Sequence, residues 1–198
     1  MEAVKMTRKG FVCRTIVIAA LVMMFQAGSV SAQSPPEVGG LLPEIDLSIP
    51  KDPEQRSYLG LTGEGSFKIP QIEGQVVIVE IFSMYCPHCQ REAPRVNEFF
   101  QLMAKHPKLK DRVKLIGIGI GNSVFEVDVF RKNYKVPFPL FADGDFSIHK
   151  ILGEVRTPYF IGVKIKDAGG HEVFYSKLGG FEKAGDFLQL MMKLSGLQ

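Results

Sequence analysis

The chain has 198 residues and is 45% hydrophobic, a length and composition typical of one soluble globular domain. Its formal net charge is +3, and residues 1–32 supply all of it through four basic residues against one acidic residue. Residues 33–198 therefore carry 20 basic and 20 acidic residues. This balance excludes the basic footprint of a nucleic-acid-binding protein, so we expect no nucleic-acid partner.

Residues 1–32 have the pattern of a secretory signal peptide. Basic residues come first, an apolar run follows at 16–25, and small residues at 30–32 fit a cleavage site before Gln33. The alternative is an uncleaved membrane anchor. The apolar run has only ten residues, whereas a membrane span needs about 20. We therefore expect a cleaved signal peptide and a periplasmic or other extracytoplasmic location.

The rest of the chain divides into two segments. Residues 33–65 are rich in proline and glycine and predict a leader followed by short strands and turns, which continue to about residue 72. Residues 66–198 predict the main domain. No internal repeat is visible in either segment.

The first half of the main domain alternates strands and helices. The β-branched run at 75–82 predicts a central parallel strand that is covered on both faces, and 113–120 predicts the next strand. A helix is expected over 87–105, kinked at Pro94, and a second one runs from a capping box at 123–126 to residue 134. The first helix has an apolar stripe formed by Cys89, Ala93, Val96, Phe100 and Met103.

The second half predicts a hairpin and a closing helix. An extended piece at 137–141 precedes a short helix that is capped by Asp145 and stops at Gly153. Strands at 159–165 and 172–176 flank a turn at 166–170. The closing helix, at 182–194, is expected to bury Phe187, Leu190, Met191 and Leu194. Parallel crossovers followed by a hairpin predict an α/β fold with a central mixed sheet and helices on both faces.

Two cysteines carry the candidate chemistry. Cys13 lies in the signal segment, so the mature chain keeps only Cys86 and Cys89. A structural disulfide between residues three apart closes almost no loop, so this spacing favours reactivity over stability. Cys86 starts the predicted helix, where free N–H groups and the helix dipole favour a thiolate. We predict Cys86 as the nucleophile and Cys89, one turn further, as the resolving thiol.

Three neighbouring residues have candidate tuning roles. A protonated His88 would add positive charge beside the thiolate, or it is an exposed residue without a role. Glu80 is the only acid in an apolar strand, and its burial would raise its pKa and make it a proton acceptor for Cys89. The alternative for Glu80 is a solvated position at a sheet edge. Glu92, one turn beyond Cys89, either tunes the pair or faces water.

These positions resemble the thioredoxin superfamily and, within it, the exported TlpA/ResA-like thiol–disulfide oxidoreductases, over residues 66–195. The cysteine pair follows the first core strand, and Glu92 and Pro94 complete the pattern C-x-x-C-x-x-E-x-P. Glu80 stands where thioredoxins carry a buried acid, and Thr157-Pro158 precedes a strand, as the family's cis-proline does.

The resemblance implies a thioredoxin-like domain over 66–198 and a cis bond before Pro158, which leaves the Thr157 backbone to dock a substrate strand. It implies no cofactor beyond the redox-active disulfide of Cys86 and Cys89, and no metal. The implied substrates are thiols and disulfides of exported proteins, including apocytochrome c during cytochrome c maturation. A membrane electron-transfer partner is implied as well.

Two features depart from the TlpA/ResA pattern. Tyr85 stands where the group usually has Trp, so an aromatic substrate surface persists with a different shape. The dipeptide Pro87-His88 resembles the oxidant DsbA, which carries a helical domain between the cysteines and the cis-proline. Here only 69 positions separate Cys89 from Pro158. The body therefore predicts a reductase and the dipeptide an oxidase or isomerase, and the redox direction stays open.

Three other functions compete with this prediction. The spacing of Met84, Cys86 and Cys89 resembles copper chaperones, which makes a Cu(I)-binding metallochaperone an alternative, although those modules are much shorter. In a peroxiredoxin, Ser83 would fit its place, but the matching proline is replaced by Val79. A non-catalytic thioredoxin-like binding domain predicts normal function after Cys86→Ala.

Overall fold

The computed structural model describes residues 34–166 and 170–197, so the signal segment and the centre of the hairpin turn lie outside the described residues. The strands are β1 (Asp46–Ser48), β2 (Ser66–Lys68), β3 (Val76–Phe82), β4 (Val113–Ile120), β5 (Leu140–Asp143), β6 (Tyr159–Ile165) and β7 (His171–Leu178). The helices are α2 (Pro53–Leu59), α3 (Pro87–Lys105), α4 (Val124–Tyr134), α5 (Ser147–Ile151) and α6 (Ala184–Ser195), with a 3-10 turn, η1, at Ile69–Gln71.

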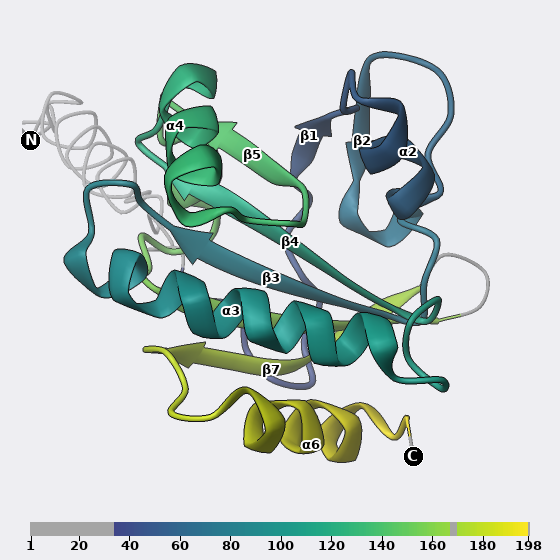
Figure 1. The fold of residues 1–198 in the computed structure, drawn as a ribbon. Helices are drawn as coiled ribbons and strands as arrows, with labels where there is room; N and C mark the ends of the chain where they lie inside the picture. Colours follow the sequence, from purple (N-terminus) through teal and green to yellow (C-terminus); the bar gives the residue numbers. More distant parts are fainter. Residues whose placement is uncertain (1–33, 167–169, 198) are drawn as a thin grey trace, which may run out of the picture. The chain divides into compact units, whose positions relative to one another are not determined.

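Five strands form one mixed sheet in the order β5-β4-β3-β6-β7, and β1 pairs with β2 in a separate antiparallel ribbon. β3, β4 and β5 run parallel, whereas β6 and β7 are antiparallel to their neighbours. Figure 1 shows α3 lying along one face of this sheet, with α6 beside it. The predicted α/β class, with a mixed sheet and helices on both faces, is confirmed.

The sheet separates two apolar cores. Side chains of α3, α4 and α6 pack on one face in a cluster that includes Phe82, Phe99 and Phe187. The other face is covered by α5 and by the segment before β3, which contributes residues such as Leu47 and Leu59. Residues before position 66 therefore share a core with the central sheet.

The strand β3 lies at the centre of the sheet and is buried over its whole length. Both faces are covered, which is why its sequence is a continuous β-branched run rather than an alternating one. Because side chains alternate along a strand, Glu80 shares its face with Ile78 and Phe82, which belong to the core beneath α3. The solvated sheet-edge position is thus excluded for Glu80.

The bounds of the strongly patterned elements agree with prediction. α3 spans the predicted residues, β4 matches its prediction, and the capping box of Ser123 and Glu126 opens α4. The buried stripe of α3 differs in one position, since Phe99 is buried and Phe100 is only partly buried. The predicted burial of two α6 residues is wrong: Leu190 is 39% exposed and Leu194 is 42% exposed.

The short helix α2 was not predicted. The expectation for this region was strands and turns, because it is rich in proline. Asp52 caps the helix by accepting a hydrogen bond from the Glu54 N–H, and Pro53 occupies the first turn, where no donor is lost. Gly60 ends it in the left-handed conformation, at φ 68°.

The region around α5 also differs from prediction in detail. The strand β5 starts three residues later than the predicted extended piece. Asp143, at the end of β5, accepts hydrogen bonds from the N–H groups of Ile148 and His149 at 3.0 and 2.9 Å. Asp145 accepts only from the N–H of Ser147, at 3.1 Å. Asp143 is therefore the main cap of this helix.

Candidate active site

Cys86 is the N-cap residue of α3, and Pro87 occupies the first helical position. Its backbone is extended, so the chain turns from the end of β3 into the helix at this residue. The Cys86 N–H donates to the Ser83 carbonyl at 3.0 Å, which closes a tight turn before the helix. The sulfur therefore sits where the helix presents unpaired N–H groups and partial positive charge.

The environment of Cys86 favours its thiolate. Partial burial alone would raise its pKa. Hydrogen bonds from the Thr157 side chain, from Cys89 and from the His88 backbone N–H outweigh burial, so the pKa of Cys86 lies below its ordinary value. Both cysteines are free thiols, and the Cys86 thiol also lies 3.5 Å from the Thr157 carbonyl oxygen, to which it donates. The structure thus represents the reduced dithiol form.

Cys89 has the opposite environment. It lies one turn into α3, on the face that packs against the sheet, and is fully buried. Burial is the main reason that the pKa of Cys89 lies far above its ordinary value, and the hydrogen bond and charge of Cys86 add to the effect. Cys89 therefore stays protonated until a base removes its proton.

Glu80 is a buried carboxyl on the same face of the sheet as Cys89. It is 3% exposed, and its Oε1 has no hydrogen-bond partner among the residues that the structure describes. Burial, and secondarily the nearby charge of Glu92, raises the pKa of Glu80 to about 8. A carboxyl with a pKa in this range exchanges protons near neutral pH.

Glu92 is buried rather than facing water, which sequence reasoning left open. Its carboxylate accepts a hydrogen bond from the Phe181 N–H at 2.8 Å and pairs with the Arg95 guanidinium at 2.5 Å. Gly180 makes room for it, since a Cβ at that position would collide with the Glu92 carboxyl group. Glu92 thus ties the start of α3 to the loop that follows β7.

Asn122 is a site residue that sequence reasoning missed. It is fully buried after the end of β4, and its Oδ1 accepts a hydrogen bond from the Met84 N–H at 2.8 Å. Gln90 holds the same turn from the other side by donating to the Met84 carbonyl at 2.7 Å. The available signal was a polar residue between a buried strand and a helix cap. Its partner lies 38 positions away, so the sequence did not reveal the contact.

The predicted substrate-docking residues lie around Cys86. The Thr157-Pro158 bond is cis, as predicted. Tyr85 is 64% exposed, and its hydroxyl donates to the carboxylate of Glu126 at the start of α4. His88 is exposed, and its Nδ1 lies 3.0 Å from Nη2 of Arg91. The structure therefore brings the predicted docking residues together around Cys86, where β3 ends, whereas Glu80 lies in the buried centre of the sheet.

Metal-binding side chains do not gather in a larger cluster in the part of the chain that the structure describes. No group of three or more His, Cys, Asp or Glu side chains in residues 34–166 and 170–197 could hold a metal ion. The imidazoles of His149 and His171 each lie 3.0 Å from a backbone carbonyl oxygen. None of the described helices is long and apolar enough to cross a membrane.

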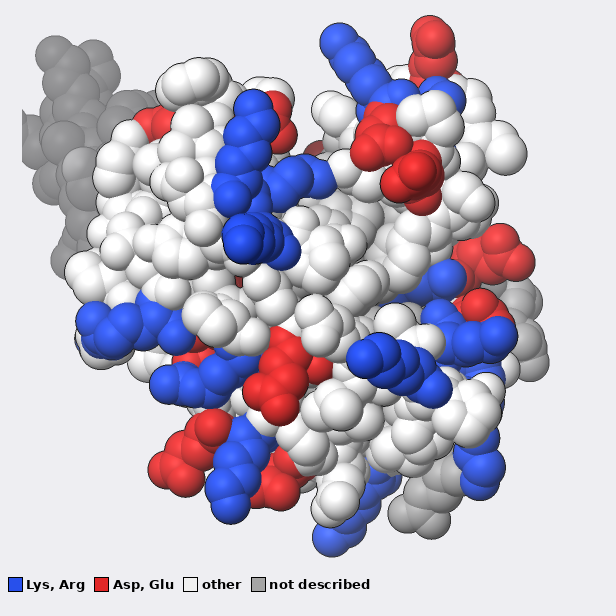
Figure 2. Space-filling model, in the orientation of Figure 1, with Lys and Arg blue, Asp and Glu red and all other residues white. Residues whose placement is uncertain are grey.

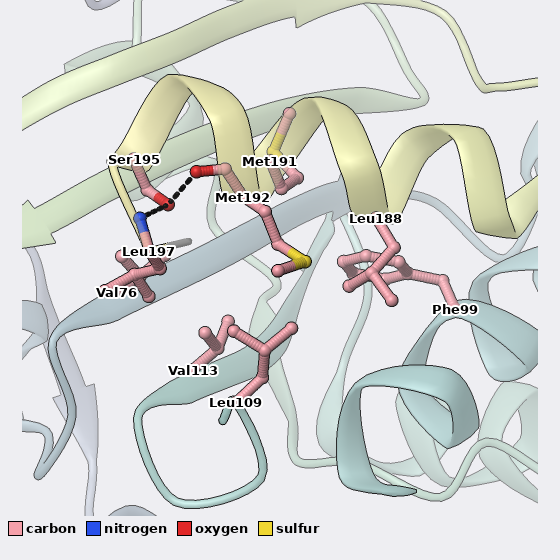
Figure 3. Close-up of a pocket in the computed structure, with 9 residues that line it drawn as sticks. All are labelled: Val76, Phe99, Leu109, Val113, Leu188, Met191, Met192, Ser195 and Leu197. Carbon is pink, nitrogen blue, oxygen red and sulfur yellow. Dashed lines mark hydrogen bonds between the residues drawn. The ribbon is translucent and has the colours of Figure 1, made fainter. Parts of the chain in front are cut away.

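A small apolar hollow lies away from the cysteines, beneath α6. Figure 3 shows it between that helix and residues such as Val76, Leu109 and Val113. Its volume is about 10 Å³, and space for even one water molecule requires roughly that much. The hollow is therefore a packing gap and not a ligand site.

Comparison with known proteins places this geometry in a family. Residues 46–171 match the model of the AhpC/TSA family. The thiol–disulfide oxidoreductase ResA of Geobacillus thermodenitrificans is 24% identical over 151 residues, which cover 74% of this chain and 77% of that protein. The sporulation thiol–disulfide oxidoreductase A of Bacillus subtilis is 32% identical over 105 residues, which cover 51% of this chain and 60% of that relative.

The fold agrees with a solved structure as well. The crystal structure of StoA from Bacillus subtilis superposes with a TM-score of 0.53 at 22% identity, over 75% of this chain and 96% of that one. At this level of identity the likeness concerns the fold.

Proposed function

Since the chain belongs to the AhpC/TSA family, we propose that it reduces disulfides of exported proteins outside the cytoplasm through Cys86 and Cys89. The chain is a thiol–disulfide oxidoreductase of the ResA and StoA type. The observation that carries the proposal is the opposite pKa shift of two thiols one helical turn apart. The Cys86 sulfur is available as a thiolate for attack, whereas the Cys89 sulfur stays protonated until the second step.

The first step is attack by the Cys86 thiolate on one sulfur of a substrate disulfide. An S–S bond forms between Cys86 and the substrate, the substrate disulfide breaks, and the leaving thiolate takes up a proton. The lowered pKa of Cys86 supplies the thiolate near neutral pH. The exposed aromatic ring of Tyr85 and the backbone of Thr157 would hold the substrate chain beside the sulfur.

The second step is resolution by Cys89. Its thiol loses a proton and attacks the Cys86 sulfur, which breaks the mixed disulfide and releases the second substrate thiolate. Two electrons have then passed to the substrate, and the protein holds the Cys86–Cys89 disulfide. With a pKa of about 8, Glu80 is ionised in about a tenth of molecules at pH 7 and accepts the Cys89 proton. A dithiol reductant, supplied by a membrane electron-transfer partner, would restore the reduced form.

The experiment tests the division of labour between the cysteines. Reduced protein is mixed with a disulfide-bonded model protein, and thiols are trapped by alkylation and weighed by mass spectrometry. Cys86→Ser is expected to abolish disulfide reduction, whereas Cys89→Ser is expected to accumulate a covalent mixed disulfide. Cys13→Ser in the full chain is the matched control and is expected to leave turnover unchanged.

Two results would contradict the proposal. Turnover that survives Cys86→Ser would show that Cys86 is not the nucleophile, and a failure of Cys89→Ser to trap substrate would remove the resolving role. Absence of turnover in wild-type protein would favour a non-catalytic binding domain. The redox direction is tested by equilibration with glutathione, read by alkylation. A potential near −270 mV supports reduction, whereas one near −120 mV supports an oxidase.

A further inference from the structure

An open groove lies beside the cysteine pair. It runs between the first turns of α3, the residues before β6 and the loop after β7, and its volume is about 380 Å³. Its walls include His88 and Arg91 from α3, Arg156 and Thr157 from the loop before β6, and Gly180. Thr157 connects the groove to the chemistry, because its carbonyl oxygen lies 3.5 Å from the Cys86 sulfur.

The groove has an excess of positive charge. Arg91, Arg95 and Arg156 line it, and Glu92 is its only acidic residue. The Glu92 carboxylate is already engaged by Arg95 and by the Phe181 N–H. One positive charge is therefore balanced and two guanidinium groups remain.

Those two guanidinium groups have no acidic partner of their own. Within the described residues, neither Arg91 nor Arg156 forms a salt bridge, and both side chains are exposed. In the described part of the chain, the hydrogen-bond partner of the Arg91 guanidinium is Nδ1 of His88, at 3.0 Å. Figure 2 shows basic and acidic side chains intermixed over the face that carries α3, so the excess in the groove is local.

We propose that this groove binds carboxylate side chains of the substrate, so that the enzyme prefers disulfides flanked by aspartate or glutamate. The proposal rests on the proposed disulfide reductase function and names its substrate class. Guanidinium groups bind carboxylates through paired, charge-assisted hydrogen bonds. A polypeptide whose sulfur reaches Cys86 passes Thr157, and its neighbouring residues then lie over Arg91 and Arg156.

The test uses three substrates that differ only in charge. Each consists of two short peptides joined by one disulfide, with a fluorophore and a quencher, and with aspartate, asparagine or lysine flanking the cysteines. Reduced protein is expected to reduce the aspartate substrate about tenfold faster than the asparagine substrate at low ionic strength, and the lysine substrate more slowly still. Because exposed charges are screened by salt, the preference is expected to shrink at about 0.5 M salt.

Charge-removing variants locate the preference. Arg91→Gln and Arg156→Gln are each expected to lower the ratio of aspartate to asparagine rates about threefold. Lys105→Gln is the matched control, since this exposed residue ends α3, about 21 Å along the helix from Arg91. It is expected to keep the wild-type ratio.

The outcomes separate the two proposals. Equal reduction of all three substrates, or a ratio that neither arginine variant changes, would overturn the acidic-substrate proposal while leaving disulfide reduction in place. If wild-type protein reduces none of the three substrates, the proposed function fails and the groove proposal falls with it.

Discussion

At the residue scale, two identical side chains acquire opposite properties through a difference of one helical turn. Cys86 meets N–H groups at the helix start and the Thr157 side chain, whereas Cys89 meets the apolar core. Burial disfavours the thiolate at both positions, but only Cys86 has enough hydrogen-bond donors to offset it. The proposed attacking and resolving roles thus rest on solvent access and hydrogen bonding.

The Thr157 hydroxyl is expected to be one of the groups that activate Cys86. Thr157→Val keeps the shape of the side chain and removes the donor, so the pKa of Cys86 should rise. A hydrogen bond to a charged group is a strong one, and we expect alkylation of Cys86 at pH 7 to slow about threefold to tenfold. The pH dependence of the alkylation rate of reduced protein measures this.

Thr62→Val is the matched control, because this threonine is exposed and follows α2, which lies away from the start of α3 (Figure 1). It should leave the alkylation profile unchanged. An unaltered profile in Thr157→Val would show that the backbone N–H groups of α3 suffice to stabilise the thiolate.

Site residues that belong to a local sequence pattern could be predicted from the sequence. Cys86 and Cys89 are two cysteines spaced three positions apart at the start of a helix, and Glu80 is the single acid in an apolar strand. The contacts of Asn122 and Thr157 with the cysteine loop could not be predicted in the same way. The hydrogen bond between Asn122 and the Met84 N–H spans 38 positions, and the one from the Cys86 thiol to the Thr157 carbonyl spans 71, so both depend on how the strands are ordered in the sheet.

At the element scale, the sequence predicts the bounds of helices with long apolar stripes to within a residue or two, and it predicts the short helix α5, but it does not predict α2. α3 has 19 residues and a regular stripe, whereas α2 has seven residues and buries only Leu59. The sequence contains the capping residues Asp52 and Gly60. With so few apolar positions between them, however, the prolines of this segment favour strands and turns over a helix. The wrong burial of Leu190 in α6 has a related cause, since an apolar stripe is wider than the contact it makes.

The link between α3 and the loop after β7 depends on a glycine. Gly180→Ala should push the Glu92 carboxylate away from the Phe181 N–H, because an added Cβ would occupy its place. Overpacking and the loss of a buried hydrogen bond lead us to expect a decrease of about 1–3 kcal/mol in the free energy of unfolding. Urea denaturation of reduced protein measures it.

A double variant distinguishes this clash from a general backbone effect. Glu92→Ala removes the group that the new Cβ would meet. The double variant should therefore lose less free energy of unfolding than the two single variants lose together. Gly185→Ala in α6 is the matched control, since a Cβ there meets nothing within 4 Å. Strict additivity of the two changes would contradict the proposed contact.

At the scale of the whole molecule, the sheet topology gathers the site from distant parts of the chain. β3 and β4 are parallel and end at the same edge, where they deliver Cys86 and Asn122. β6 starts at that edge and β7 ends there, because Tyr159 pairs with both Ile81 and Leu178. Thr157 and Gly180 therefore meet the start of α3 through strand register alone.

The same topology places Glu80 at the centre of the sheet, where its charge affects the stability of the entire domain. The pKa of Glu80 rises from 4.5 to about 8 on folding, so the folded protein holds the proton more tightly than the unfolded chain. This contribution to stability is complete below about pH 4.5 and is lost as the pH rises through about 8. One pKa unit corresponds to about 1.4 kcal/mol, so the loss is on the order of 5 kcal/mol.

Glu80→Gln keeps the size of the side chain and cannot ionise. The difference in free energy of unfolding between this variant and wild-type protein should increase steadily from about pH 5 to pH 8 and then level off, because only the wild type loses stability as Glu80 ionises. All other ionisable groups contribute equally to both proteins and cancel in the difference. Urea denaturation of both reduced proteins at several pH values measures the difference. Glu98→Gln, an exposed replacement on α3, is the matched control and should retain the wild-type pH dependence. A difference between Glu80→Gln and wild type that does not vary with pH would mean that Glu80 is already ionised in the folded protein, and it would then have no proton to exchange with Cys89 near neutral pH.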